Sequence, residues 1–496
     1  MNGNRPRRRA WRVGITAAAV AAVAVLGLAA PASAAPLVDP NATGSITVHK
    51  FQTPDTPTGL PNNGTQVNTT GLTPLAGVTF QVQRVTDIDL STNQGWTTAS
   101  ALSTALDPAN PAGSITGAGH TLGAGTSQVT SAAGTAAFTA LPIGLYLVQE
   151  TSYPAGVTPS APFLVSVPLT DPNNHDAWLY DVHVYPKNAV TTATKTVSDA
   201  AAVKLGDQVS FRITSDIPNA SPIDGFRIVD PLDARLTYVS TAVRLADGTA
   251  ITLGTDYTVT HDAGTNAVTI DFTAAGRAVL AAHNTTSVVA DIVTTVNTVG
   301  EISNTARVYP NQASFTITPG QPGGPTVTPP VETHWGGITL QKVNGSGTPL
   351  TGASFKVFTS AADAAAQTNP VTIAGQSTFT VTAANGTLTI SGLRYSDFAN
   401  GATVAPGDPG YLRYYLVETV APAGYELLAQ PVSFTVTAAT SAVGVDLTVT
   451  NVPHNAGFEL PFTGGTGPGM LYLAGVLLIV GGIGFLLIRR RRTRQG

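Results

Sequence analysis

Short stretches of alternating apolar and polar residues recur along the chain, and this period of two is typical of half-buried β-strands. The first stretch is Gly44-Ser-Ile-Thr-Val-His-Lys50, and Leu75–Val82 repeats the pattern. Strand patterns return at Gly144–Glu150 and at Trp178–Lys187. Because turn residues separate these stretches, they predict a domain of short strands that closes near Asn188.

The same patterns occur a second time towards the C-terminal end. Gly337–Lys342 matches the first stretch, and Leu350–Val357 matches the second. Tyr414–Tyr425 matches the segment that begins at Leu145. Three matching blocks in one order indicate that the first and third domains share a fold.

A different unit lies between the two repeats. It has strand patterns at Gly206–Ile213, Phe226–Asp233 and Glu301–Val308. Residues 319–336 follow it and contain a Pro/Gly run, which predicts a linker stiffer than a Gly/Ser one.

Two polar segments of the first domain lack a clear strand pattern. Ser91–Ala136 is rich in Ser, Thr, Gly and Ala. It is predicted to form loops with one short helix near residues 98–105, and any ligand binding is expected there. Asp171–Asp176 places several oxygen ligands close together, but it lacks the spacing of a dedicated calcium loop. A polar turn is therefore the preferred interpretation of that segment.

Both ends of the chain resemble targeting segments. Five arginines precede the apolar stretch Val13–Ala30, and Ala32-Ser-Ala34 follows, which is typical of a secretory signal peptide over residues 1–34. Near the other end, Met470–Ile488 is 19 residues without a charge, enough to cross the roughly 30 Å core of a bilayer. Arginines 489–492 mark its cytoplasmic side. The alternatives are a retained N-terminal helix and a permanent C-terminal membrane anchor.

The amino-acid composition supports a fold rich in β-strands and argues against several classes of function. Only 11% of residues are charged, and Thr, Val, Ala, Gly and Pro are abundant, which suits β-sandwiches with many turns. Without the two arginine-rich ends the chain has 15 basic and 29 acidic residues, a net charge near −14, which argues against nucleic-acid binding. No cysteine is present, so no disulfide can brace the domains. The eight histidines form no His-Glu-x-x-His motif, and Gly-x-Ser-x-Gly is absent, so no metal or cofactor is predicted.

Each of the three units has a lysine on its first strand, an asparagine near its end and an acid on a strand between them. The lysine and asparagine are 109 residues apart in the second unit, 109 in the third and 138 in the first, which contains the insertion. The simpler interpretation is that these are exposed strand lysines and edge asparagines, because lysine is seldom fully buried. The residues are Lys50, Glu150 and Asn188; Lys195, Asp230 and Asn304; and Lys342, Glu418 and Asn451.

Two motifs carry a family resemblance. The block Tyr-x-Leu-Val-Glu-Thr-x-Ala-Pro-x-Gly-Tyr around Glu418, and its near copy around Glu150, resemble the E-box of shaft pilins from sortase-assembled Gram-positive pili. Trp178–Lys187 resembles the Trp-to-Tyr-Pro-Lys pilin motif of that family. The resemblance implies an all-β chain of three tandem immunoglobulin-like sandwich domains related to collagen-adhesin repeats. The first E-box departs from the pattern, with Ser152-Tyr153 where the third domain has Val420-Ala421.

The resemblance also implies that each lysine forms an isopeptide bond with its asparagine, assisted by the acid. The bond Lys50–Asn188 is the least secure, because not every member of the family has one in its first domain. Burial lowers the pKa of a lysine and raises that of a carboxyl group, so a neutral amine can attack the asparagine carbonyl while a protonated Asp or Glu polarises it and shuttles the proton.

The tail resembles a sorting signal, with a pentapeptide, a short gap, an apolar span and a basic end in that order. Sortases cut such a signal between Thr463 and Gly464, and in shaft pilins the lysine at the position of Lys187 attacks the acyl intermediate. The implied partners are identical subunits in a head-to-tail polymer, a pilus sortase, a housekeeping sortase, peptidoglycan, and tip and minor pilins. The pentapeptide is Leu460, Pro461, Phe462, Thr463 and Gly464.

These features together predict a shaft subunit of a covalent, wall-anchored surface pilus, held at the membrane only transiently. It would be a substrate of sortase and not an enzyme for an outside substrate. A wall-anchored adhesin or minor pilin that binds a host ligand is the main alternative, and a secreted hydrolase would need a catalytic domain that the sequence does not reveal. The predicted divisions are 1–34 (signal), 35–188, 189–318, 319–336 (linker), 337–456, and 457–496 (sorting signal, helix and basic tail).

Overall fold

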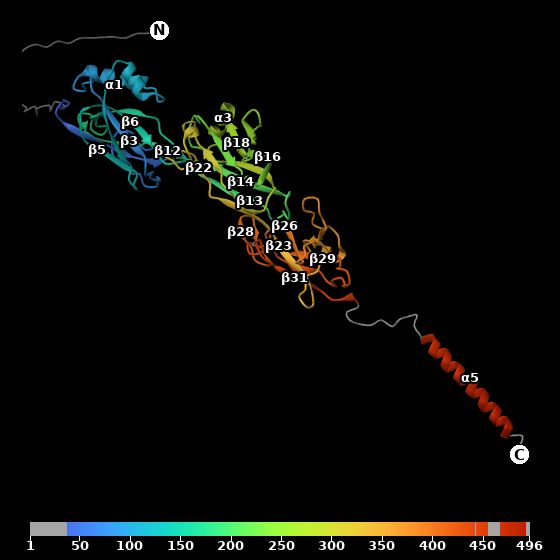
Figure 1. The fold of residues 1–496 in the computed structure, drawn as a ribbon. Helices are drawn as coiled ribbons and strands as arrows, with labels where there is room; N and C mark the ends of the chain where they lie inside the picture. Colours follow the sequence, from blue (N-terminus) through green and yellow to red (C-terminus); the bar gives the residue numbers. More distant parts are fainter. Residues whose placement is uncertain (1–36, 442, 455–466, 493–496) are drawn as a thin grey trace, which may run out of the picture.

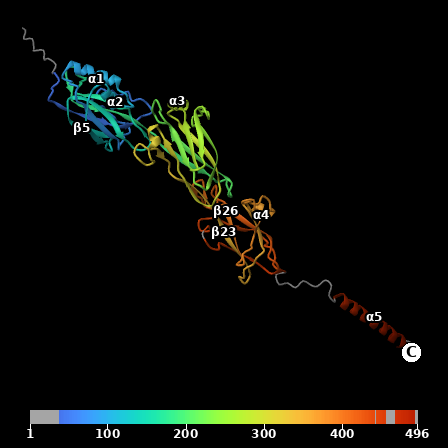
Figure 2. The same cartoon turned by 45° about the horizontal axis from the view of Figure 1, so that its top comes forward.

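The computed structural model describes residues 37–441, 443–454 and 467–492. Three β-domains follow one another along the long axis of the molecule, and two views agree on this row (Figures 1 and 2). The predicted all-β class with three tandem sandwich domains is confirmed. The predicted signal peptide and the pentapeptide Leu460–Gly464 lie outside the described residues.

The first domain is a sandwich of two sheets. Strands β4, β3, β6 and β8 form one sheet, and β5, β1 and β11 form the other, while β2, β12 and β7 form a smaller third sheet. Strand β1 runs parallel to β11, because Ser45–Val48 pairs with Asp181–Val184, and β2 runs parallel to the last strand, β12. The strands are β1 (Thr43–His49), β2 (Phe51–Gln52), β3 (Thr79–Val85), β4 (Leu122–Val129), β5 (Thr135–Pro142), β6 (Gly144–Ser152), β7 (Val157–Thr158), β8 (Phe163–Val167), β9 (Leu169–Thr170), β10 (Trp178–Leu179), β11 (Asp181–Val184) and β12 (Lys187–Val190).

The insertion of the first domain is more ordered than its composition predicts. Helices α1 (Asn93–Ala105) and α2 (Pro111–Gly117) cover one face of the β4-β3-β6-β8 sheet, so the prediction of loops is wrong. The predicted short helix is confirmed as the second half of α1. Thr92 caps α1 by accepting from the Gly95 amide at 3.0 Å. Apolar side chains that are sparse in the sequence, including Leu102 and Ile115, form a second small core against the sheet.

The second domain has its own core between a four-stranded sheet (β13, β14, β19, β16) and a five-stranded sheet (β17, β18, β15, β21, β22). Alternation explains its strands, since every second residue of β14 is buried. Its elements are β13 (Ala193–Ser198), β14 (Gln208–Asp216), β15 (Arg227–Pro231), β16 (Leu236–Leu245), β17 (Tyr257–Asp262), β18 (Ala267–Phe272), α3 (Ala274–Ala282), β19 (Ser287–Val296), β20 (Gly300–Asn304), β21 (Arg307–Tyr309), the 3₁₀ turn Ala313–Thr316 and β22 (Thr326–Val327).

Residues 319–336 are not a free linker between domains. Strand β22 pairs with β21 in the second domain, and the first half of β23 (Val331–Asn344) pairs with β20. The Gly323 amide also donates to the Tyr153 carbonyl of the first domain at 2.7 Å. Trp335 is fully buried in the core of the second domain. This Pro/Gly segment is therefore ordered, because pairing with distant strands satisfies backbone groups that its sequence pattern does not predict to be paired.

The third domain begins on the same long strand that leaves the second. Beyond the part that pairs with β20, strand β23 pairs with β26 and runs parallel to β31. Strands β25, β24, β29 and β30 form the facing sheet. As in the first domain, the first strand lies parallel to the last. The elements are β24 (Ser354–Phe358), α4 (Ala361–Ala366), β25 (Phe379–Thr380), β26 (Thr387–Arg394), β27 (Phe398–Ala399), β28 (Ala402–Thr403), β29 (Tyr414–Val420), β30 (Val432–Phe434) and β31 (Leu447–Asn451).

A buried arginine joins the second and third domains. Arg394 on β26 is 1% exposed, and its Nε donates to the Ala202 carbonyl of the second domain at 2.9 Å. Its Nη2 donates to the Gly410 carbonyl at 2.8 Å. Beside it, Asp199 and Asn400 exchange hydrogen bonds across the same interface. The two domains therefore meet through paired polar groups as well as through β23.

Helix α5 (Gly467–Arg492) contains the predicted apolar segment. In the part of the chain that the structure describes, no helix is long and apolar enough to span a membrane.

Candidate cross-linking sites

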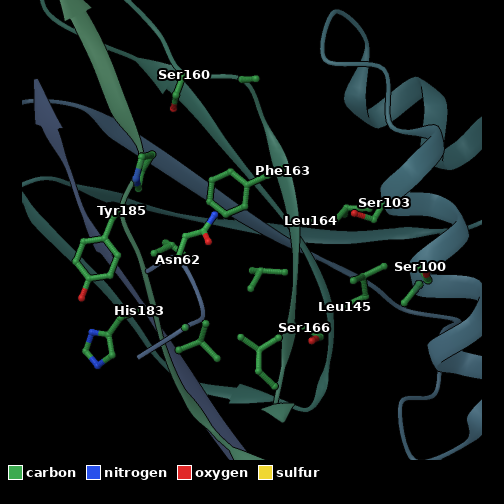
Figure 3. A pocket seen from close by; sticks show the side chains of 18 of the residues that line it. Asn62, Ser100, Ser103, Leu145, Ser160, Phe163, Leu164, Ser166, His183 and Tyr185 are labelled. Carbon is green, nitrogen blue, oxygen red and sulfur yellow. The ribbon is translucent and has the colours of Figure 1, made fainter. Parts of the chain in front are cut away.

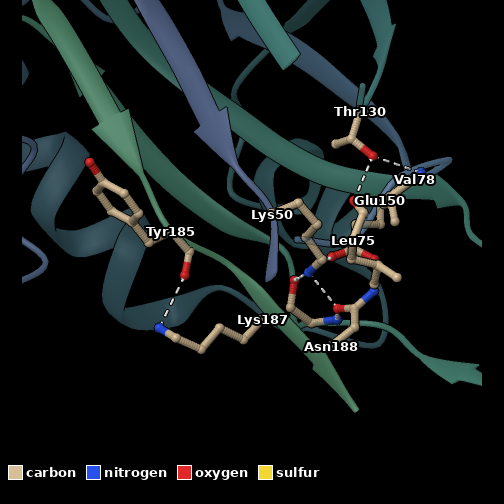
Figure 4. A network of polar contacts seen from close by, with 9 residues as sticks. Lys50, Leu75, Val78, Thr130, Glu150, Tyr185, Lys187 and Asn188 are labelled. Carbon is tan, nitrogen blue, oxygen red and sulfur yellow. Dashed lines mark hydrogen bonds and ion pairs between the residues drawn. The ribbon is translucent and has the colours of Figure 1, made fainter. Parts of the chain in front are cut away.

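The first domain brings together all three residues predicted for its cross-link (Figure 4). Lys50 lies between β1 and β2 and is fully buried, as is Asn188 on the parallel strand β12. The Lys50 Nζ is 2.6 Å from Oε1 of Glu150 and 2.5 Å from Oδ1 of Asn188. The Asn188 Nδ2 donates to the other carboxyl oxygen, Oε2, at 2.7 Å. One carboxyl oxygen thus faces the amine and the other faces the amide nitrogen.

Parallel pairing explains why the lysine and asparagine meet. Lys187 lies opposite Phe51 in the parallel pair of β12 and β2. The residue opposite Lys50 is therefore the one before Lys187, and Asn188 lies two residues further along. The third domain has the same offset, because Lys342 lies opposite Val449 and Asn451 is two residues further along. Residues two apart on a strand share a face, so both asparagines project towards the lysine side of the sheet.

Ser160 is a member of the first site that sequence reasoning missed. Its Oγ donates to Oε1 of Glu150 at 2.5 Å, and its backbone amide donates to Oδ1 of Asn188 at 2.6 Å. The available signal was its distance from the acid, since Ser160 follows Glu150 by ten residues and Leu428 follows Glu418 by ten. A serine among polar turn residues carries no other mark in the sequence.

The second domain also gathers its three predicted residues. The Lys195 Nζ is 2.6 Å from Oδ1 of Asp230, and both side chains are fully buried. The Asn304 Nδ2 donates to the other oxygen, Oδ2, over a long 3.5 Å. Among the described residues, Oδ1 of Asn304 has no hydrogen-bond partner. The carboxyl group is again divided between amine and amide, in a looser arrangement than in the first domain.

The third domain brings together only two of its three residues. The Asn451 Nδ2 lies 3.0 Å and 2.9 Å from the two carboxyl oxygens of Glu418. Lys342 is fully buried on the neighbouring strand, but its Nζ donates to the Val449 carbonyl at 2.8 Å. In this conformation the Lys342 amine is bonded to a backbone carbonyl and not to Asn451, although β23 lies beside the strand that carries Asn451.

Burial sets the protonation of these groups. Desolvation lowers the pKa of Lys50, Lys195 and Lys342 to about 8 in each case. The neighbouring acid opposes this shift without cancelling it. Desolvation also raises the pKa of Asp230, against the opposing effect of Lys195. Both shifts bring the second site closer to a neutral amine beside a protonated acid.

Lys187 has a different environment from the three buried lysines. It is half-buried, and Figure 4 shows its side chain directed away from the Lys50 cluster. Its only described hydrogen bond is a long one, 3.5 Å, from Nζ to the Tyr185 carbonyl. A half-buried amine with one weak hydrogen bond is more available to an external reactant than the fully buried lysines. Its proposed reactant, Thr463, lies outside the described residues.

A cavity of about 650 Å³ lies beside the pilin motif, between α1 and strands β8 and β11 (Figure 3). Ser100 and Ser103 line it from the helix, and Ser160 and Tyr185 line it from the segments before β8 and after β11. Trp178 stacks on Trp96 of α1 with ring centroids 5.7 Å apart. The tryptophan of the motif therefore helps to hold the insertion against the domain.

The segment Asp171–Asp176 forms a turn. Asp171 Oδ1 accepts from the Asn173 amide at 2.8 Å. Over the residues that the structure describes, no group of three or more His, Asp or Glu side chains is arranged to hold a metal ion.

Comparison with known proteins assigns each domain. Residues 41–189 match the model for the Gram-positive pilin subunit D1, N-terminal domain. Residues 190–314 match the Sgo0707 N2 domain, and residues 336–451 match the prealbumin-like fold domain.

Relatives align over nearly the whole chain. It is 35% identical to fimbrial subunit type 1 of Actinomyces viscosus and 34% identical to fimbrial subunit type 2 of Actinomyces naeslundii. These alignments cover 96% and 97% of this chain and 96% of each relative. The solved full-length major pilin SpaD of Corynebacterium diphtheriae is 28% identical with a TM-score of 0.66, over 84% of this chain and 98% of that one. The chain therefore belongs to the family of Gram-positive fimbrial subunits, the pilins.

Proposed function

We propose that this chain is the shaft subunit of a covalent surface pilus, polymerised between Lys187 of one subunit and Thr463 of the next. The observation that carries the proposal is the placement of two consecutive residues on β12. Successive residues of a strand point to opposite faces. Lys187 is half-buried and is directed away from the Lys50 cluster, while Asn188 is fully buried beside Lys50.

Membership of the pilin family makes the chain a structural subunit and not an enzyme. In the proposed polymerisation, a sortase cuts between Thr463 and Gly464 and holds the Thr463 carbonyl as an acyl intermediate. The Lys187 amine then attacks this carbonyl, loses a proton and releases the sortase. The product is an amide bond between subunits, and a pilus sortase would catalyse this step.

Within each domain we propose an isopeptide bond between the buried lysine and asparagine. The neutral Lys50 amine attacks Cγ of Asn188, and the carboxyl group of Glu150 takes a proton from Nζ and gives one to the departing Nδ2 as ammonia. The division of the carboxyl oxygens between Nζ and Nδ2 supports this scheme. In the second domain, Lys195, Asp230 and Asn304 have the roles of amine, acid and amide. In the third domain, Lys342 must first turn from Val449 towards Asn451, beside Glu418.

The cross-links place a covalent path next to the polymer linkage. In the proposed polymer a pull enters at Lys187 and leaves at Thr463, so it runs through the second domain, where the Lys195–Asn304 bond would carry it from β13 directly to β20. The path does not require the hydrogen bonds between strands to bear the load. This arrangement suits a subunit that transmits tension along a fibre.

The ends of the chain complete the proposal from the sequence alone. The signal peptide directs export, and the apolar segment at 470–488 holds the subunit at the membrane until Thr463 is transferred. A housekeeping sortase attaches the finished polymer to peptidoglycan, and tip and minor pilins are further partners.

Replacing Lys187 with alanine should abolish polymerisation, because the external nucleophile is lost. Cell-wall extracts would then show monomers in place of high-mass ladders on denaturing gels. Lys356, on β24 of the third domain, provides the matched control, since Lys356→Ala leaves the motif intact and should keep the ladders. Ladders that persist in Lys187→Ala would mean that another lysine forms the linkage.

Immunoelectron microscopy separates a shaft subunit from the alternative of an adhesin or minor pilin. An antibody to this chain should label fibres at regular intervals along their length. Label confined to fibre tips or to the wall would support the alternative instead.

A further inference from the structure

Ser160 contacts all three residues of the first cross-linking site. It lies between β7 and β8 and is half-buried. Its hydroxyl donates to Oε1 of Glu150 at 2.5 Å and accepts from the Lys50 Nζ at 3.3 Å. Its backbone amide donates to Oδ1 of Asn188 at 2.6 Å. These contacts involve the acid, the nucleophile and the carbonyl group that the nucleophile attacks.

The other two sites lack this arrangement in the described part of the chain. Leu428 occupies the corresponding position in the third domain, and its amide donates to Oε2 of Glu418 at 3.0 Å. Oδ1 of Asn451 has no hydrogen-bond partner there, and neither has Oδ1 of Asn304 in the second domain. Only the first site, among the described residues, presents donors to the carbonyl oxygen of its asparagine.

We propose that Ser160 is a fourth catalytic residue of the first domain, with two roles in forming the Lys50–Asn188 bond. This inference rests on the proposed isopeptide chemistry. The backbone amide stabilises negative charge on Oδ1 as Nζ bonds to Cγ, because a preorganised donor is most effective where charge develops. The hydroxyl holds Oε1 of Glu150 against Nζ, 2.6 Å away, so that this oxygen takes the proton from the amine directly.

Electrons and protons balance in this step without an outside reactant. The Nζ lone pair forms the bond to Cγ, and the carbonyl π electrons move onto Oδ1. A proton passes from Nζ directly to Oε1, which the Ser160 hydroxyl holds in place, while the proton on Oε2 passes to Nδ2. The C–N bond then breaks, ammonia leaves, and the Oδ1 electrons restore the carbonyl. Glu150 ends the cycle protonated as it began.

The experiment follows cross-link formation in newly made full-length protein. Cell-free synthesis is stopped after a short pulse, and tryptic peptides joined through Lys50 and Asn188 are quantified over time by mass spectrometry. Ser160→Ala keeps the backbone amide but removes the hydroxyl, and it should slow the first-domain bond at least about tenfold. The Lys195–Asn304 peptide, measured in the same samples, should form at the wild-type rate.

Matched variants separate chemistry from packing. Ser160→Thr retains a hydroxyl and should form the bond near the wild-type rate, whereas the similarly shaped Ser160→Val should be as slow as Ser160→Ala. Ser166→Ala alters a buried serine that also lines the cavity, and it should have no effect. If Ser160→Ala fails to fold, as judged by protease sensitivity, the Thr and Val pair decides the question.

Two results would overturn the inference in different ways. A wild-type rate in Ser160→Ala or Ser160→Val would show that Ser160 has no catalytic role while the bond itself still forms. Absence of the Lys50–Asn188 peptide from the wild-type chain would refute the first-domain bond and, with it, this role for Ser160.

Discussion

At the scale of single residues, burial explains how ordinary side chains acquire unusual protonation. Lys195 and Asp230 are removed from water together, so the charged form of each is disfavoured. Transfer of one proton from the amine to the carboxyl group then yields a nucleophile and an acid in one step. The reaction therefore requires that the amine be neutral while the carboxyl group carries a proton.

The second-domain bond should therefore form with a bell-shaped dependence on pH. Above about pH 8, Lys195 is neutral but the pair has lost its last proton, so no acid remains to protonate the leaving group. Below the raised pKa of Asp230 the pair gains a second proton, and the amine is charged. Pulse synthesis followed by a shift in pH, with the Lys195–Asn304 peptide as the readout, measures the profile. A rate that keeps increasing to pH 10 would show that the free amine suffices.

At the scale of elements, each proposed cross-link would join the start of a domain to a strand near its end. In the third domain β23 and β31 are already parallel neighbours, so the bond would add a covalent link to an existing pair. Its main thermodynamic effect is on the unfolded chain, in which it would close a loop of 109 residues. The loop limits the conformations available after unfolding.

Replacing Glu418 with glutamine should leave the third domain without its cross-link. The intact mass should then be about 17 Da higher, after correction for the substitution, because one ammonia is retained. The variant should also lose roughly 4 to 5 kcal/mol of unfolding free energy, by analogy with a disulfide that closes a loop of this size. Denaturant titration measures the loss.

Glu301→Gln changes an exposed acid on β20 and is the control for that experiment. It should retain the cross-linked mass and the wild-type stability. A Glu418→Gln protein with the cross-linked mass would show that Lys342 and Asn451 react without the acid, or through another one.

At the scale of the whole molecule, the three domains are joined more closely than a chain of independent modules. The segment predicted as a linker pairs with the second domain and contacts the first, and β23 continues into the third. Arg394 and the Asp199–Asn400 pair add buried polar contacts at the second joint. Bending between the second and third domains would break these contacts, so the row in Figure 1 should be stiff there.

Replacing Arg394 with alanine should loosen the joint between the second and third domains. The carbonyls of Ala202, Phe398 and Gly410 would lose their donor, and each unsatisfied buried group costs about 1 to 3 kcal/mol. Small-angle scattering should show a broader distribution of interdomain distances, and melting of the two domains should become less cooperative.

Arg212→Ala is the matched control, because Arg212 forms an ion pair with Asp291 on an exposed face of β14. Its loss should change stability by about 1 kcal/mol or less. Equal scattering profiles for wild type and Arg394→Ala would mean that β23 alone maintains the joint.

The sequence by itself determined many of the strands and named the lysines, acids and asparagines that the structure places close together in the first two domains. Alternation identifies strands because it reflects the local geometry of a half-buried sheet, as in β1 and β14. Lys342 and Asn451 could be recognised because a lysine and an asparagine recur at matching places in each unit. In the third domain the parallel pairing of β23 with β31 then places Asn451 two residues beyond the residue opposite Lys342.

Only the tertiary structure decided which side chains meet. Leu102 and Ile115 become a core only when the sheet beneath the helices is formed, and the Pro/Gly segment becomes ordered only through distant strands. Ser160 joins Lys50 through contacts 110 residues apart in the sequence, and Lys342 turns to a backbone carbonyl that no local pattern specifies. Such contacts join residues that are far apart in the sequence. They form only when the whole domain packs, so no local sequence pattern reveals them.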